Sequence, residues 1–158
     1  MSGIRLLRPA VLAAVVLGVL AAPATSWSAL SPAQRAVQVA KASLKGQHGV
    51  RWEALHPKYQ AVVSKARFVA CERKNAAALG QLSIVGVQAE GTSVFHEAMP
   101  ALGTVDVNAV TLAITFRQGV QKQDRIAEVE SLWVTYKGRW VQLYSPDEYN
   151  AYKAGKCP

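Results

Sequence analysis

The sequence predicts an α+β protein, with helices in the first half, an antiparallel sheet in the second half and a short helix at the C-terminus. Two observations carry this prediction. Between residues 31 and 79, apolar residues recur at steps of three and four, which is the spacing of helices that bury one side. From residue 82 onward the period is two and the connections are short, so the predicted sheet has four or five antiparallel strands.

The helical half divides into several helices with kinked joints. A helix begins at Ser31 and Pro32, an N-cap followed by a proline at the first helical position, and Gly46 ends it. The step from His56 to Pro57 breaks the next helix, because the residue before a proline avoids the α region. The predicted helices cover residues 32–45, 50–55, 57–63 and 65–79.

Glycines and polar loops separate the runs with strand character in the second half. The clearest alternation of apolar and small polar residues lies between Val110 and Phe116. The alternation slips near Glu130 and Ser131, which predicts a β-bulge at that point. The predicted strands cover residues 82–90, 93–98, 104–116, 125–136 and 139–144, and a short helix over 147–154 follows them.

The first 24 residues have the pattern of a secretory signal peptide. A short segment containing Arg5 and Arg8 precedes an apolar run over residues 10–22, and a small-residue site of the A-x-A kind follows at residues 22–24. The apolar run is shorter than the roughly 20 residues that a membrane-spanning helix needs. A retained N-terminal anchor is the alternative to cleavage.

Export places the remaining chain in the periplasm, the cell envelope or the extracellular space. We expect cleavage after Ala24, with Ser26 as the second choice. Residues 25–30 are then a flexible mature N-terminus. Residues 31–158 contain no repeat and no linker, so they are expected to form a single α+β domain.

The basic residues lie mainly in the helical half. The whole chain has a formal net charge of +8, and residues 25–80 hold nine Lys or Arg but only two acidic residues. Such a layer suits weak contact with anionic envelope surfaces, although an ordinary solvated helix surface is the interpretation we favour. The basic residues form no dense cluster interleaved with aromatic residues, so we expect no binding to nucleic acid.

The chain has two cysteines, Cys71 and Cys157, and they form no CxxC motif. In an exported protein the default for such a pair is a disulfide, which would join the C-terminal tail to the helix over 65–79. Closing a loop of this length is worth about 4–5 kcal/mol in the chain-entropy model. Two buried free thiols are the alternative.

Several short motifs of the mature chain point to one superfamily. They are Trp52-x-x-Leu55-His56-Pro57, Val63-Ser64, Phe68-x-x-Cys71, Gly138-Arg139-Trp140 and the closing segment from Tyr149 to Pro158. Together with the order of helices and strands, they resemble small exported bacterial proteins of the nuclear-transport-factor-two-like (SnoaL-like) superfamily. The resemblance implies a cone-shaped fold, in which kinked helices pack on a strongly curved sheet. It implies no single activity, because this superfamily includes isomerases, dehydratases, transport factors and non-catalytic modules.

The candidates for proton transfer are few. Enzymes with this fold place an acid or a base in the pocket between the helices and the sheet. His56 at the helix joint is one candidate, and its alternative role is to cap backbone groups. Glu128 and Glu130 are two more, since they lie on the same face of one strand about 7 Å apart. Their alternative role is a solvated sheet face.

Four aromatic residues are candidates for lining a pocket that takes a flat apolar ligand. They are Trp52, Tyr59, Trp133 and Tyr144, and a place in the core is their alternative role. The three histidines are too scattered for a zinc site, and no phosphate-binding loop is present, so we expect neither a metal nor a cofactor.

Together these observations favour an exported, non-catalytic module that binds a protein partner or a small apolar ligand. The alternative is a small-molecule lyase or isomerase that uses an ionisable group in the cone pocket. A homodimer through the sheet face, on the threonine-rich side of residues 111–115, is a further expectation.

Overall fold

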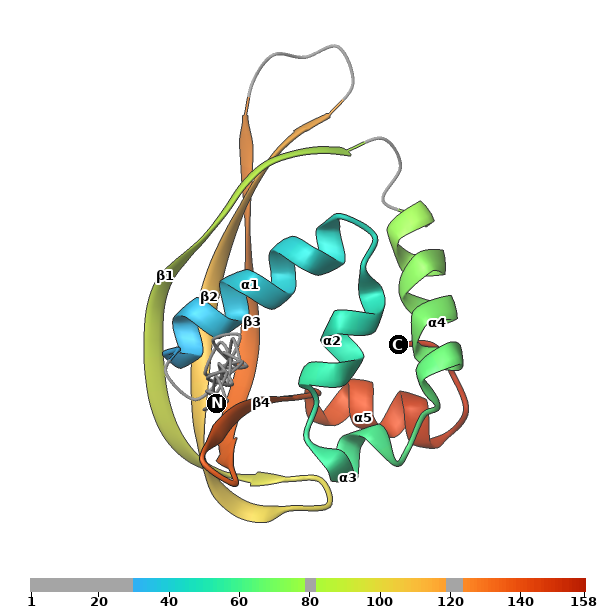
Figure 1. Cartoon of the computed structure of the whole chain (residues 1–158), viewed down its shortest axis with the longest axis vertical. Coiled ribbons are helices and arrows are strands. Elements are labelled where there is room, and N and C mark those ends of the chain that lie inside the picture. Colours follow the sequence, from blue (N-terminus) through green and yellow to red (C-terminus); the bar gives the residue numbers. More distant parts are fainter. Residues whose placement is uncertain (1–29, 79–81, 119–123) are drawn as a thin grey trace, which may run out of the picture.

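The computed structural model of the 158-residue chain describes residues 30–158 except 79–81 and 119–123. The elements in chain order are α1 (Pro32–Leu44), α2 (His48–Ala54), α3 (Pro57–Gln60), α4 (Lys65–Ala78), β1 (Leu82–Met99), β2 (Gly103–Gln118), β3 (Arg125–Tyr136), β4 (Arg139–Leu143) and α5 (Pro146–Lys153). Helices precede an antiparallel sheet and a short helix closes the chain, which confirms the predicted α+β class (Figure 1).

The predicted signal peptide and its two cleavage sites lie outside the described residues, so they stay predictions. Most of the predicted flexible N-terminus also lies outside them. Among the helices that the structure describes, none combines the length and the apolar character needed to cross a bilayer.

The sheet is a meander in which each strand pairs with the next in antiparallel fashion, in the order β1-β2-β3-β4. The two strands predicted over 82–90 and 93–98 are one strand, β1, so the sheet has four strands. Gly91 does not end the strand, because it pairs with Thr111 within the ladder. The register shifts between Ala89 and Gly91, so the glycine marks a bulge in an edge strand.

The predicted bulge at Glu130 and Ser131 is wrong, because both residues pair with β2 in unbroken register. The pattern slips there for another reason. Residues 131–134 are all buried, although successive side chains of a strand point to opposite faces. Trp133 belongs to one core cluster and Leu132 to the other, so both faces of the sheet are covered at this point.

The sheet is not strongly curled, so it lacks the strong curvature that the family resemblance implies. Register shifts occur at two places, both in the edge strand β1, near Gly86 and Gly91. The described pairs between β2 and β3 and between β3 and β4 have no shift. Bulges bend a sheet locally, so a sheet whose inner ladders are regular stays open.

Helix α1 lies across the sheet and covers part of one face (Figure 1). It begins with a capping box, in which the Oγ of Ser31 accepts from the backbone N–H of Gln34 and the side chain of Gln34 accepts from Ser31. Ala36 and Val39 on its inner side are buried. Their cluster contains three sheet residues, Val110, Leu112 and Trp133.

The kinked joint that the sequence predicts before Pro57 lies against the sheet edge. The backbone N–H of His56 donates to the carbonyl of Gln142 in β4 at 2.9 Å, and Leu55 forms a parallel bridge with the same residue. The Nδ1 atom of His56 accepts from the backbone N–H of Lys58 at 3.2 Å and caps α3. The joint therefore positions the start of α3 and extends the sheet edge.

A cluster of aromatic side chains joins α3, α4 and α5 to the end of the sheet. The ring centroids of neighbouring pairs lie 4.9 to 6.2 Å apart, which is the range of favourable aromatic contacts. The members are Tyr59 of α3, Phe68 of α4, Tyr144 after β4, and Tyr149 and Tyr152 of α5.

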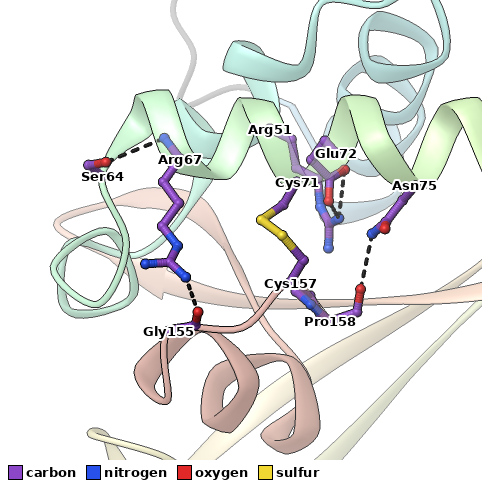
Figure 2. Close-up of a disulfide and its surroundings, with 9 residues drawn as sticks. All are labelled: Arg51, Ser64, Arg67, Cys71, Glu72, Asn75, Gly155, Cys157 and Pro158. Atoms are coloured by element: carbon purple, nitrogen blue, oxygen red, sulfur yellow. Dashed lines mark hydrogen bonds and ion pairs between the residues drawn. A yellow bond between two sulfur atoms is a disulfide. The ribbon is translucent and has the colours of Figure 1, made fainter.

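The C-terminal tail is bonded to α4, as predicted. Cys71 and Cys157 form a disulfide with their Cα atoms 5.4 Å apart. Two further contacts hold the same tail, as Figure 2 shows: Arg67 donates to the carbonyl of Gly155, and the Nδ2 of Asn75 donates to the carbonyl of Pro158 at 3.1 Å. The disulfide is consistent with an oxidising compartment.

Replacing both cysteines by serine (Cys71→Ser with Cys157→Ser) should lower the free energy of unfolding by about 4 kcal/mol. The 86-residue separation gives the unfolded chain a large gain in entropy when the crosslink is absent. Urea unfolding measures the difference, and reduced wild-type protein is the control that should match the double variant. Peptide mapping without reductant should give one crosslinked pair, and two alkylatable thiols would contradict the assignment.

Candidate ligand-binding site

A cavity of about 260 Å³ lies between α1, the adjoining helices and one face of the sheet, and we call it the α1 cavity. Five of the six apolar groups around it come from α1 and β2, and the polar groups other than Ser43 come from the other elements. The lining residues are Ala36, Val39, Ala40, Ser43 and Leu44 of α1, Arg51 of α2, Glu72 of α4, Leu112 of β2, Val129 and Ser131 of β3, and Gln142 of β4.

Two polar residues of adjacent strands form the floor of the α1 cavity. The Oγ of Ser131 accepts from the indole Nε1 of Trp133 at 2.9 Å and from the Nε2 of Gln142 at 3.1 Å. All three side chains lie on one face because Ser131 and Trp133 are two residues apart and Trp133 pairs with Gln142. The hydrogen bonds hold the Gln142 amide in one orientation beside the cavity.

Two buried oxygens at the α1 cavity have no hydrogen-bond partner among the described residues. They are the Oε1 of Gln142 and the Oγ of Ser43. Gln142 is only 7% exposed. A buried acceptor without a partner costs roughly 1–3 kcal/mol, so a ligand that donates a hydrogen bond to it would recover part of this free energy.

Arg51 joins three helices at the edge of the same cavity. Its Nη1 lies 3.1 Å from the Oε2 of Glu72 in α4, and its Nη2 lies 2.8 Å from the Oε1 of Glu148 in α5. Burial by itself lowers the pKa of Arg51, but the charges of Glu148 and Glu72 outweigh it and the pKa is raised. The guanidinium therefore stays charged, and both oxygens of Glu72 accept from it.

A second cavity of about 300 Å³ adjoins the first near the C-terminal end of α1. The two cavities share Ser43, Leu44 and Glu72 as lining residues. The second one is also lined by His48, which is 8% exposed and whose Nδ1 has no partner among the described residues. His48 and Glu72 thus line the same cavity.

Of the residues that the sequence suggested for proton transfer, His56 lines neither cavity. It is 6% exposed, its Nδ1 is used as the cap of α3, and its ring meets the ring of Tyr136 edge-on at 4.5 Å. Glu128 and Glu130 lie on β3 opposite Ala113 and Thr111 and are both exposed. Neither carboxylate lines either cavity.

The four aromatic candidates lie in the core or beside it. Tyr59, Trp133 and Tyr144 are fully buried, and Trp52 is half-buried with its Nε1 donating to the carbonyl of Val63 at 3.1 Å. None of the four lines the two cavities. Burial raises the pKa of Tyr59 and of Tyr144, so both phenols stay protonated.

The sequence reasoning missed the polar residues of the α1 cavity. Gln142 interrupts an apolar run, and Ser131 directly precedes one. A polar residue in or beside a buried apolar run is the signal that could have found them. Ser43 and Glu72 gave no comparable signal, because polar residues are ordinary on a helix that has a solvated side.

Comparisons with known proteins give one structural similarity and no family for this chain. No model of a protein family matches this chain, and no curated protein matches it. Among solved structures, the chain is similar to the solution structure of a SEC-C motif containing protein from Rhodopseudomonas palustris, with a TM-score of 0.48 and 15% sequence identity. The match covers 74% of this chain and 77% of that protein.

Replacing the bridging arginine by an apolar residue (Arg51→Met) should lower the free energy of unfolding by about 2–4 kcal/mol. The change leaves the carboxylates of Glu72 and Glu148 close together without their cation. Because the site is partly exposed to solvent, removing the cation costs less free energy than it would at a fully buried site. Arg73→Met is the matched control, because Arg73 is an exposed residue of α4 and its loss should cost under about 0.5 kcal/mol. Equal urea midpoints for the two variants would contradict the assignment.

The His56 cap predicts a pH dependence of stability. Burial, with a smaller contribution from the charge of Lys58, lowers the pKa of His56 below its ordinary value of 6.5. As the pH falls, the unfolded chain therefore binds a proton at a higher pH than the folded protein does. The stabilisation that the neutral His56 cap provides is complete above pH 6.5 and is lost as the pH falls through the lowered pKa. In His56→Asn, which keeps a capping side chain, the free energy of unfolding should fall less between about pH 7.5 and 4.5. Parallel pH profiles for the two proteins would rule out this role.

Proposed function

We propose that this protein is an exported, non-catalytic module that binds a small, mostly apolar molecule in the α1 cavity. The observation that carries the proposal is the buried Oε1 of Gln142, which has no partner among the described residues and lies at a cavity with mainly apolar walls. Ligand pockets of this kind combine apolar walls with a few placed polar groups. The ligand would carry a hydroxyl or another hydrogen-bond donor at one end.

The charges at the α1 cavity favour binding over catalysis. Arg51 and Glu72 are the ionisable residues among those that line it, and they are paired with each other. A general base needs a lone pair that can reach the substrate. The oxygens of Glu72 already accept from Arg51, so they are poorly placed for that role.

Membership of the nuclear-transport-factor-two-like superfamily is part of this proposal. It is supported by the order of helices, antiparallel meander and short final helix, and by a cavity beneath the first helix. The regular inner ladders and the lack of strong curl weigh against a typical member. A protein partner, weak contact with anionic surfaces and a homodimer through the sheet face stay predictions.

A probe of matching chemistry tests the proposed ligand class. 2-Naphthol has an apolar body and one hydroxyl donor, and naphthalene has the same body without the donor. Gln142→Met should weaken binding of 2-naphthol about 5- to 10-fold, which is the value of one hydrogen bond, and leave naphthalene unchanged. Calorimetric titration measures both affinities. An equal change for the two probes would remove Gln142 from the site.

A cavity-filling variant tests the location of the proposed site. Ala40→Phe places a ring in the α1 cavity and should abolish binding of both probes. Ala70→Phe is the matched control, because the same change is made at an exposed position of α4 and should leave binding intact. Native mass spectrometry of protein purified from the cells that make it should show a bound small molecule that Ala40→Phe lacks. Binding that survives Ala40→Phe would overturn the proposal.

A lyase or isomerase is the second candidate, and one observation favours it. The Nδ1 of His48 has no partner among the described residues, and His48 lines the same cavity as Glu72. An imidazole is the commonest general base in enzymes. If this candidate is correct, the protein should introduce deuterium from heavy water into a compound of its host's metabolite extract, and His48→Gln should stop the exchange. Exchange that His48→Gln leaves unchanged would exclude His48 as the base.

A further inference from the structure

A third cavity, of about 380 Å³, lies between α1, α2 and β4 and is separate from the site already described. It shares no lining residue with the α1 cavity. Its lining includes Arg35 of α1, Val50, Glu53 and Ala54 of α2, and Arg139 and Trp140 of β4. We call it the arginine cavity.

Two positive charges face the arginine cavity. Arg35 is only 6% exposed, and its Nη1 donates to the Oε1 of Gln38 at 2.7 Å, which fixes the orientation of the guanidinium. Arg35 and Arg139 line the same cavity, so their like charges repel each other. Burial lowers the pKa of Arg35, and the charge of Arg139 lowers it further. An anion placed at both groups would relieve this repulsion.

The acidic residue at the arginine cavity does not neutralise the pair by itself. Glu53 forms an ion pair with the Nζ of Lys65, a residue that does not line the cavity. Arg139 is exposed, and it forms no ion pair among the residues that the structure describes. The residues that line the cavity thus include two arginines and one glutamate.

The remaining wall of the arginine cavity is apolar and includes one flat ring. Trp140 is half-buried and packs against the core cluster that contains Ala54. Val50 packs against the same cluster. An indole supported from behind offers a flat apolar surface on which another ring can stack.

We infer that the arginine cavity binds a small organic anion with a flat apolar body, of the aromatic carboxylate class. The carboxylate lies at Arg139 and Arg35, and the ring lies along Trp140. Arginine suits this task because its planar group of donors matches the two oxygens of a carboxylate. The cavity volume is within the range of small-molecule sites.

The test is a calorimetric titration of the full disulfide-bonded protein with 2-naphthoate. Arg139→Gln, a change at an exposed residue, should weaken binding at least about 10-fold, as expected for the loss of a charge-assisted contact. Lys137→Gln is the matched control, because it removes the same charge two residues away, at a position outside the cavity. It should leave the affinity unchanged. The neutral analogue 2-naphthamide should bind at least about 10-fold more weakly than 2-naphthoate to the wild-type protein.

Three results would overturn the inference. The first is the absence of saturable binding of 2-naphthoate. The second is an equal loss of affinity in Arg139→Gln and Lys137→Gln, which would indicate diffuse attraction by a basic surface. The third is displacement of 2-naphthoate by an equal concentration of inorganic phosphate, which would indicate recognition of charge alone. Trp140→Leu supports the inference if it lowers the affinity for 2-naphthoate and leaves the far-ultraviolet circular dichroism spectrum unchanged. Ala40→Phe supports it if the variant still binds 2-naphthoate.

Discussion

The arrangement of the helices depends on one ion-pair bridge. Arg51 in α2 contacts Glu72 in α4 and Glu148 in α5, three residues that are far apart in the chain. Their side chains are between 15% and 29% exposed, so solvent weakens these contacts less than it would at the surface. The disulfide joins α4 to the tail beside this bridge, as Figure 2 shows for Arg51, Glu72 and the two cysteines. Together they fix α2, α4 and α5 relative to one another.

The same bridge shapes the α1 cavity. Two of its members, Arg51 and Glu72, line the cavity opposite the apolar side of α1. The sheet contributes a floor in which Ser131 bonds to both Trp133 and Gln142. One face of the sheet thus carries a fixed polar group between apolar walls. A site of this construction selects a ligand by shape and by one hydrogen bond, and it offers little for proton transfer.

The sequence predicts the fold well because each step depends on local chemistry. The cap at Ser31, the break before Pro57 and the pairing of Cys71 with Cys157 are each set by one or two residues, and the structure has all three. The bulge predicted near Ser131 is wrong for a reason that lies outside the local sequence. That part of β3 is covered on both faces, and only the tertiary structure determines what covers a strand.

The candidate site was harder to predict than the fold. Aromatic residues such as Tyr59 and Trp133 are typical of ligand pockets, but they are equally suited to a hydrophobic core. In this structure they are buried in the core. The cavity instead uses Gln142 and Glu72, which come from elements far apart in sequence. Such a meeting of residues depends on how the helices pack, and no spacing along the chain encodes it.

The most direct test of the proposed site is the nuclear magnetic resonance signal of the Trp133 indole N–H, which donates to Ser131 on the floor of the α1 cavity. Saturating the ¹⁵N-labelled protein with 2-naphthol should shift this signal and the side-chain amide signals of Gln142, and should leave the indole signal of Trp52 in place. A saturable interaction that shifts the Trp52 signal and leaves those of Trp133 and Gln142 unchanged would contradict a binding site at this floor.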